Sequence, residues 1–130
     1  MRPHVELIQE GDLVWHPAEL TRGEGKARQR NLSYDEENGG ASTRVVFETA
    51  WSRPAGYHHG DVEWYVMSGQ LKIGERLIGK GGYFRAPAGL RIPAIQVAAG
   101  TDVLIFREFG DWGFSVSAKN RSRFIPRGGN

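Results

Sequence analysis

The stretch GGYFRAPAGL, residues 81 to 90, carries the signals that bound a short β-strand. Gly81 and Gly82 permit the backbone conformations of a tight turn, because glycine has no Cβ that would clash in them. The next residues include two aromatic side chains, which are enriched in strands. Pro87 ends the run at a place where no donor for the hydrogen-bond ladder is needed. We therefore expect a turn followed by a strand over residues 83–87.

Similar β-branched and aromatic runs recur between clusters of turn residues along the chain. The segment 20–40 is polar, charged and interrupted by glycine, so we predict a long loop or arm there. Seven or eight strands in one small domain favour a sandwich or a barrel, because doubling or closing the sheet buries the strand edges. The predicted strands are residues 12–18, 42–50, 63–68, 71–75, 83–87, 95–99, 102–109 and 112–118.

The length of 130 residues is enough for one domain with a single core. We divide it into an N-terminal strand and arm (1–41), a barrel core (42–118) and a basic C-terminal tail (119–130). The 17 basic and 15 acidic residues are otherwise mixed along the sequence. The tail lacks the aromatic and basic spacing of a recognition module, so no nucleic-acid partner is expected.

The absence of cysteine excludes disulfides, zinc thiolate sites, iron-sulfur clusters and cysteine nucleophiles. A metal ion would need histidine, carboxylate or amide ligands. No apolar run near the N-terminus has the length of a signal peptide, and none elsewhere approaches the length that spans a bilayer. We expect a soluble, cytoplasmic protein without a membrane partner.

From residue 56 onward the sequence resembles the cupin superfamily, the RmlC-like jelly-roll barrels. The second cupin motif reads Gly, five residues, Pro, one residue, Gly, two residues, His, three residues, Asn, and this chain has Gly81, Pro87 and Gly89 at that spacing. Ile92 stands in place of the metal-binding histidine, and Gln96 in place of the asparagine. The resemblance implies an all-β, single-domain cupin-like jelly-roll barrel with little helix and degenerate metal-binding motifs.

The first cupin motif, usually His, one residue, His, three or four residues, Glu, six residues and Gly, matches residues 56–69 in two registers. A one-residue shift moves every side chain of a strand to the other face, so the two registers exclude each other unless a bulge at Gly60 absorbs the difference. Counting back from Gly69 places Gly56, His58 and Val62 at the three ligand positions, whereas counting from His59 and Glu63 places Tyr57, His59 and Glu63 there.

In the second register Tyr57, His59 and Glu63 face the barrel interior together. An imidazole titrates near neutrality, a carboxylate orients it, and a phenol donates to an oxygen that becomes negative. The set resembles cupins that work without metal through His and Tyr, such as sugar-nucleotide epimerases and small dehydratases. Our first hypothesis is therefore an enzyme that isomerises, dehydrates or cyclises a small organic substrate without a cofactor. His59 is then the base, Glu63 its orienting partner or the acid, and Tyr57 a hydrogen-bond donor.

Further residues near the two motifs are candidates for substrate binding. An inward guanidinium would bind a carboxylate or phosphate, or stabilise an enolate-like oxygen. Residues that share the parity of Glu63 would wall the pocket, and a tryptophan lining it would suit a ring-shaped ligand. The candidates are Trp51, Tyr65, Met67, Arg85, Arg91 and Gln96.

Two other hypotheses stay open. One is a metal-dependent cupin dioxygenase or lyase, in which His58, His59 and Glu63 hold iron, zinc or manganese; it requires the strand to break at the adjacent histidines. The other is a non-catalytic cupin that binds a small ligand. The resemblance also implies a homodimer formed through the N-terminal arm or an edge strand.

Overall fold

A computed structural model of the protein describes residues 7–18, 20–108 and 113–117. These residues form strands and a short 3₁₀ turn, η1 (Glu10–Asp12), and none of their helical segments is long and apolar enough to cross a membrane. The strands are β1 (His16–Pro17), β2 (Ala27–Tyr34), β3 (Ala41–Phe47), β4 (Trp51–Arg53), β5 (Gly56–His58), β6 (Val62–Ser68), β7 (Gln70–Ile73), β8 (Arg76–Gly79), β9 (Tyr83–Ala86), β10 (Ile95–Val97), β11 (Asp102–Arg107) and β12 (Phe114–Val116).

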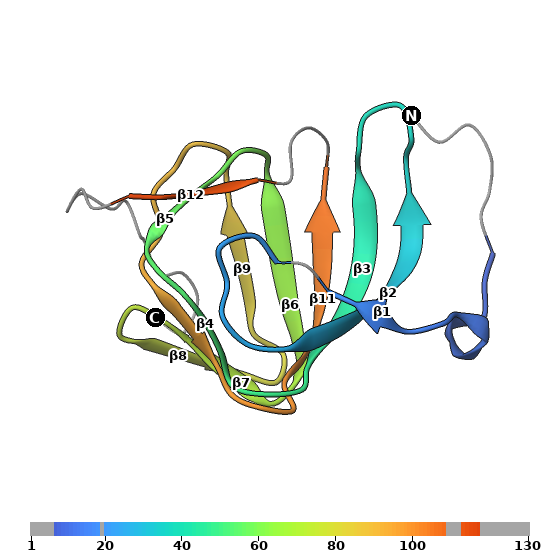
Figure 1. Ribbon diagram of the computed structural model, residues 1–130, viewed down its shortest axis with the longest axis horizontal. Helices are drawn as coiled ribbons and strands as arrows, with labels where there is room; N and C mark the ends of the chain where they lie inside the picture. The colour runs from blue at the N-terminus through green and yellow to red at the C-terminus, as the bar shows by residue number, and fades with distance from the viewer. Residues whose placement is uncertain (1–6, 19, 109–112, 118–130) are drawn as a thin grey trace.

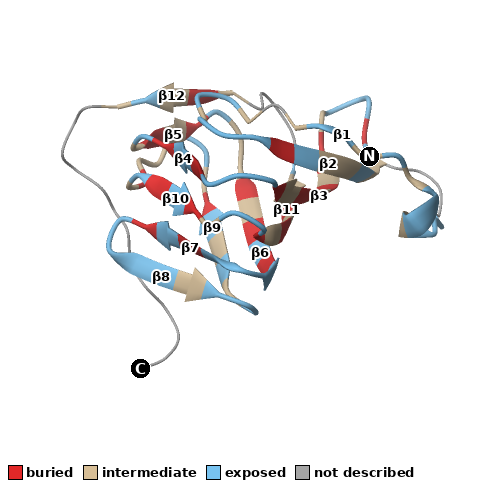
Figure 2. Cartoon of the chain, turned by 60° about the horizontal axis from the view of Figure 1, so that its bottom comes forward, coloured by how far each residue is buried: buried red, intermediate tan, exposed pale blue. Residues whose placement is uncertain are grey.

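The strands form two facing layers of antiparallel sheet, as in a jelly roll. One layer is a six-stranded sheet in the order β1-β2-β3-β11-β6-β9, and Figure 1 shows its strands β9, β6, β11, β3 and β2 side by side from the centre to the right. The second layer is a four-stranded sheet, β4-β10-β7-β8, and the β5–β12 ribbon lies beside β4 at its end (Figures 1 and 2). The all-β jelly-roll prediction is confirmed.

The core fills the space between the layers with alternate residues of each strand. Along β3 and β6, buried residues alternate with more exposed ones, and Figure 2 shows the same alternation on neighbouring strands. Aromatic rings from three elements meet there: Phe47 lies 5.3 Å from Trp51 and 6.0 Å from Trp64, measured between ring centroids. Such contacts add to the burial of large apolar side chains.

Most predicted strands are present, but the loop predicted for residues 20–40 is wrong in its second half. Residues 27–34 form β2, which pairs with β3. Its polar composition is compatible with a strand because most of its side chains are partly or fully exposed. Strands β4, β5 and β8 were also not predicted. The basic tail, residues 119–130, lies outside the described residues.

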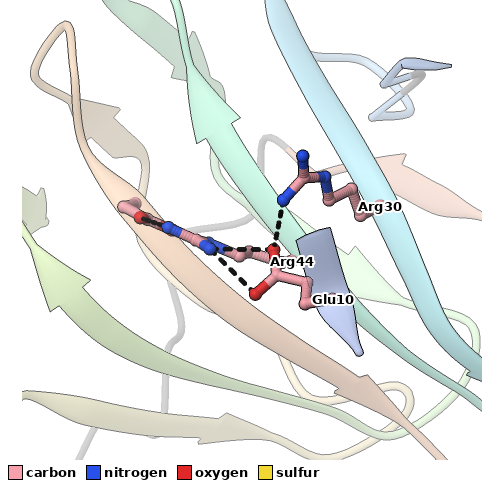
Figure 3. A network of polar contacts seen from close by, with 4 residues as sticks. Glu10, Arg30 and Arg44 are labelled. Atoms are coloured by element: carbon pink, nitrogen blue, oxygen red, sulfur yellow. Dashed lines mark hydrogen bonds and ion pairs between the residues drawn. The ribbon is translucent and has the colours of Figure 1, made fainter. Parts of the chain in front are cut away.

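An ion-pair network holds η1 against the outer face of the six-stranded sheet (Figure 3). The carboxylate of Glu10 accepts hydrogen bonds from Arg44 at 2.8 and 2.9 Å and from Arg30 at 3.1 Å. Arg44 also donates to both carboxylate oxygens of Asp102, at 3.0 and 2.5 Å. A bidentate guanidinium within a network is the arrangement in which surface ion pairs do contribute to stability. The strand predicted for residues 12–18 is correspondingly short, since only His16–Pro17 pairs with β2.

Candidate functional site

The first motif adopts the register in which Gly56, His58 and Val62 point into the barrel. Gly56 and His58 are buried on β5, and Tyr57 between them is half-buried. On β6 the buried residues are Val62, Trp64 and Val66. This register is favoured because the opposite one would expose Trp64 and two valines to water.

The prediction that Tyr57, His59 and Glu63 face the interior is therefore wrong. The imidazole of His59 is exposed, and its Nε2 lies 2.7 Å from Ser115 Oγ on β12. Glu63 accepts a hydrogen bond from the hydroxyl of Tyr83 on the outer face, and this bond, together with partial burial, raises the pKa of Tyr83. The three residues do not share a pocket, because period-two alternation places them on the face opposite to Val62 and Trp64.

The predicted substrate-binding residues also lie away from the interior cavity. Arg85 is exposed and forms an ion pair with Asp61 at 3.1 Å, while Arg91 is half-buried with Nη2 3.5 Å from the carbonyl of Ser117. Trp51 belongs to the aromatic core. The remaining three have exposed side chains on β6 and β10: Tyr65, Met67 and Gln96.

A cavity of about 110 Å³ lies between the layers. Its titratable residues come from three strands: Arg53 from β4, His58 from β5 and Arg107 from β11. We call it the arginine pocket and define it by its lining residues, Leu20, Thr21, Arg53, His58, Val62, Trp64 and Arg107.

Neither arginine was predicted as a site residue, although alternation gives a usable signal for both. Arg53 shares the parity of Trp51 on β4, and both are buried. Arg107 shares the parity of Val103 and Ile105 on β11, which are fully buried. An arginine in phase with core residues is a candidate for a buried charge.

The geometry of Arg53 and His58 fixes the hydrogen-bonding role of the imidazole. Nη1 of Arg53 lies 3.1 Å from Nε2 of His58. A guanidinium can only donate, so Nε2 must be the acceptor and the proton of the neutral ring resides on Nδ1. Both side chains are 5% exposed, and His58 Nδ1 and Arg53 Nε have no hydrogen-bond partner among the described residues. Two buried donors are thus available in one site.

Two guanidinium groups line the arginine pocket, and burial shifts the pKa of each. Burial, followed by the nearby charge of Arg107, lowers the pKa of Arg53 to about 10. Burial likewise lowers the pKa of Arg107. Burial, followed by the charges of Arg53 and Arg107 and then His59, lowers the pKa of His58 to about 3. The imidazole is therefore neutral at physiological pH and serves as a donor through Nδ1–H.

The donor set at the cupin metal position does not fit a metal ion. The positions that would carry ligands hold Gly56, His58, Val62 and Ile92, of which His58 alone has a coordinating side chain. A backbone bridge between Gly56 and Ile92 brings the two motifs together. No group of three His, Asp or Glu side chains gathers anywhere in the described ranges, so His58, His59 and Glu63 are not brought together. The guanidinium on His58 Nε2 adds a repelling charge at the remaining ligand.

Comparison with known protein families identifies the family to which the chain belongs. Residues 6–123 match a family described as a domain of unknown function, DUF4437. The chain belongs to this family. Its fold is that of the cupin superfamily, as the two motifs implied. No curated protein matches the sequence.

Solved structures share the fold at low sequence identity. A putative acetylacetone dioxygenase from Methylibium petroleiphilum has a TM-score of 0.67 and 16% identity over 85% of this chain and 84% of its own. The polyketide cyclase RemF from Streptomyces resistomycificus has a TM-score of 0.66 and 16% identity over 95% of this chain and 88% of its own. A putative dioxygenase from Nostoc punctiforme has a TM-score of 0.73 and 19% identity, covering 89% of this chain and 44% of its own.

Proposed function

We propose that this cupin is an enzyme that binds a small organic molecule as its anion in the arginine pocket and performs acid-base chemistry on it without a resident metal. The observation that carries the proposal is the burial of Arg53 without a carboxylate partner among the described residues. Its side chain is 5% exposed, and no carboxylate in the described ranges pairs with it. A buried charge without a counter-ion is costly, so a site that keeps one in a cavity is suited to an anionic ligand.

The chemistry follows from what the pocket residues can donate. Arg53, Arg107 and the Nδ1–H of His58 are positioned to stabilise negative charge on an oxygen, as in the formation of an enolate. A depressed pKa keeps the imidazole neutral, and its one N–H, on Nδ1, can donate to a carbonyl oxygen that becomes an enolate. Isomerisation, dehydration and cyclisation of carbonyl compounds all pass through such an oxyanion.

His58 also acts as a hydrogen-bond donor in the proton-transfer step. The charges of Arg53 and Arg107 contribute to its low pKa. Its Nε2 already accepts a hydrogen bond from Arg53, so the ring acts through its Nδ1–H, which donates to the substrate oxygen that becomes negative. Water takes the proton that the substrate carbon loses and returns it to carbon. This places the hydrogen-bonding role on His58 rather than on the exposed His59.

The test is solvent exchange, because enolate formation replaces C–H by C–D in deuterated water. Proton NMR would follow the exchange of α-protons in a panel of short oxo acids and in acetylacetone, the compound in the name of one similar structure. We expect exchange with the wild-type protein and a loss of about 100-fold in rate for Arg53→Met and His58→Gln. Arg85→Met, which removes an exposed arginine outside the pocket, is the matched control and should keep the wild-type rate.

Either of two results would refute the proposal. One is that no compound shown to bind exchanges its protons, which would leave a non-catalytic binding protein. The other is that Arg53→Met and His58→Gln exchange as fast as Arg85→Met.

A further inference from the structure

We infer that the ligand of the arginine pocket is a short oxo acid whose carboxylate is bound in the plane of the Arg53 guanidinium, by its Nε–Nη2 edge. This inference rests on the proposed function, in that it names the class of the anion. It goes further because it assigns the two carboxylate oxygens of the ligand to the Nε–Nη2 edge of Arg53.

The first step concerns the faces of the Arg53 guanidinium. The ring of Phe114 lies 4.2 Å and the ring of Trp51 5.1 Å from its central carbon. Aromatic rings packed against a guanidinium leave its N–H groups, which lie in its plane, for hydrogen bonds. A ligand carboxylate would therefore bind Arg53 along an edge of the guanidinium.

The second step identifies which edge is open. Nη1 donates to His58 Nε2 at 3.1 Å. Nε is buried and has no partner among the described residues. The Nε–H and the adjacent Nη2–H are parallel and are spaced for the two oxygens of a carboxylate, which is the usual bidentate geometry of arginine with planar acids. A tetrahedral phosphate matches one such edge with two of its oxygens and leaves the others to be satisfied elsewhere in the pocket.

The third step concerns the second polar group of the ligand. The Nδ1–H of His58 is a second buried donor without a partner in the described chain, and Arg107 brings a second positive charge to the same cavity. A carboxylate alone would use one guanidinium edge. A carbonyl oxygen on the same molecule provides the acceptor for Nδ1–H, and it becomes the second negative charge when an enolate forms.

The fourth step is size. A cavity of about 110 Å³ has room for several water molecules but not for a polycyclic compound. The uncharged part of its wall includes Leu20, Val62 and Trp64. These residues favour a ligand with a short apolar portion between or beside its polar groups. The combination of carboxylate, carbonyl and a few carbons defines a short-chain 2-oxo or 3-oxo acid.

Isothermal titration with acetoacetate, its amide acetoacetamide and inorganic phosphate tests the inference on the wild-type protein. We expect acetoacetate to bind at least tenfold more tightly than either of the other two. Equal binding of the acid and the amide, tighter binding of phosphate, or no binding of acetoacetate would each overturn the assignment. None of these comparisons requires a variant to fold.

Arg53→Lys tests the edge itself, because lysine keeps the charge but cannot present two parallel donors. We expect it to lose at least tenfold in acetoacetate affinity while the exposed control Arg85→Lys binds as the wild type does. Unchanged affinity in Arg53→Lys would overturn the bidentate contact.

The exchange experiment separates this inference from the proposed function. Acetoacetate that binds selectively but exchanges no protons would refute the enzymatic function and leave the carboxylate assignment standing. Exchange of acetylacetone protons by a pocket that shows no preference for the acid over the amide would refute the assignment and leave the function standing.

Discussion

The buried imidazole of His58 makes the free energy of unfolding depend on pH, starting above the range in which carboxylates ordinarily titrate. In the folded protein its pKa is lowered from 6.5 to about 3, first by burial and then by Arg53 and Arg107. In the unfolded chain the imidazole recovers its ordinary pKa. The unfolded state therefore binds an extra proton between these two values, and stability is complete above 6.5 and is lost as the pH falls toward 3.

The loss of stability depends on how far the pH falls below the pKa of the imidazole in the unfolded chain. Each unit of pH below the unfolded pKa costs about 1.4 kcal/mol, so lowering the pH from about 7 to about 5 costs about 2 kcal/mol. Aspartate and glutamate ordinarily titrate near about pH 4, so their contribution begins mostly below this range. Urea denaturation at the two pH values measures the difference directly.

His58→Gln and His59→Gln form a matched pair of variants, because the two histidines are adjacent in sequence and one is buried while the other is exposed. The wild type and His59→Gln should both lose about 2 kcal/mol between about pH 7 and about pH 5, whereas His58→Gln should lose much less. If His58→Gln is too unstable to measure, ¹⁵N NMR of the wild-type imidazole gives the same information. Protonation of His58 near its ordinary pKa of 6.5 would refute the account of a buried, positively surrounded ring.

Three further predictions concern the scaffold, each measured by urea denaturation. Trp64→Ala should cost about 3–5 kcal/mol, because the indole is 1% exposed and its removal leaves a cavity between the layers; a cost below about 1 kcal/mol would contradict the packing. Arg44→Ala should lower the free energy of unfolding by about 1 kcal/mol, and by less in high salt, because the ion pairs of Arg44 are partly exposed. A loss of stability that is independent of salt would refute an electrostatic contribution of these ion pairs. Gly69→Ala and Gly81→Ala share a positive φ of 86° and 84°, but a Cβ at Gly69 would overlap Thr101 whereas one at Gly81 would meet no atom. Gly81→Ala should therefore cost about 1 kcal/mol and Gly69→Ala clearly more, and equal costs would show that the overlap at Gly69 is relieved.

The architecture was predictable because the strongest local signals coincide with its turns. Gly81 precedes β9 with a positive φ, and the strand ends immediately before Pro87, as glycine and proline chemistry requires. The elements that were missed have a physical explanation as well. The strand β2 is polar because its side chains are largely exposed, so neither its composition nor its period separated it from a loop.

The interior of the site was not predictable from local sequence. Along β6 both faces carry large side chains: Val62, Trp64 and Val66 on one, and Glu63, Tyr65 and Met67 on the other. Local alternation cannot decide between two such faces, and the choice depends on pairing with β11 and β9, which lie far along the chain. The general rule that charged residues lie at the surface also does not predict arginines inside the barrel.

The choice of register determines the class of chemistry that the barrel can support. With Glu63 inside, a carboxylate would enter the cavity of Arg53 and Arg107, neutralise one guanidinium and leave less attraction for an external anion. With Val62 inside, the cavity wall at this point is apolar, and no carboxylate of the described residues pairs with Arg53. The cupin motif has a carboxylate ligand at the position that Val62 occupies in this chain. Under the proposed function, an apolar residue at that position and two arginines in the same pocket suit an anion better than a cation.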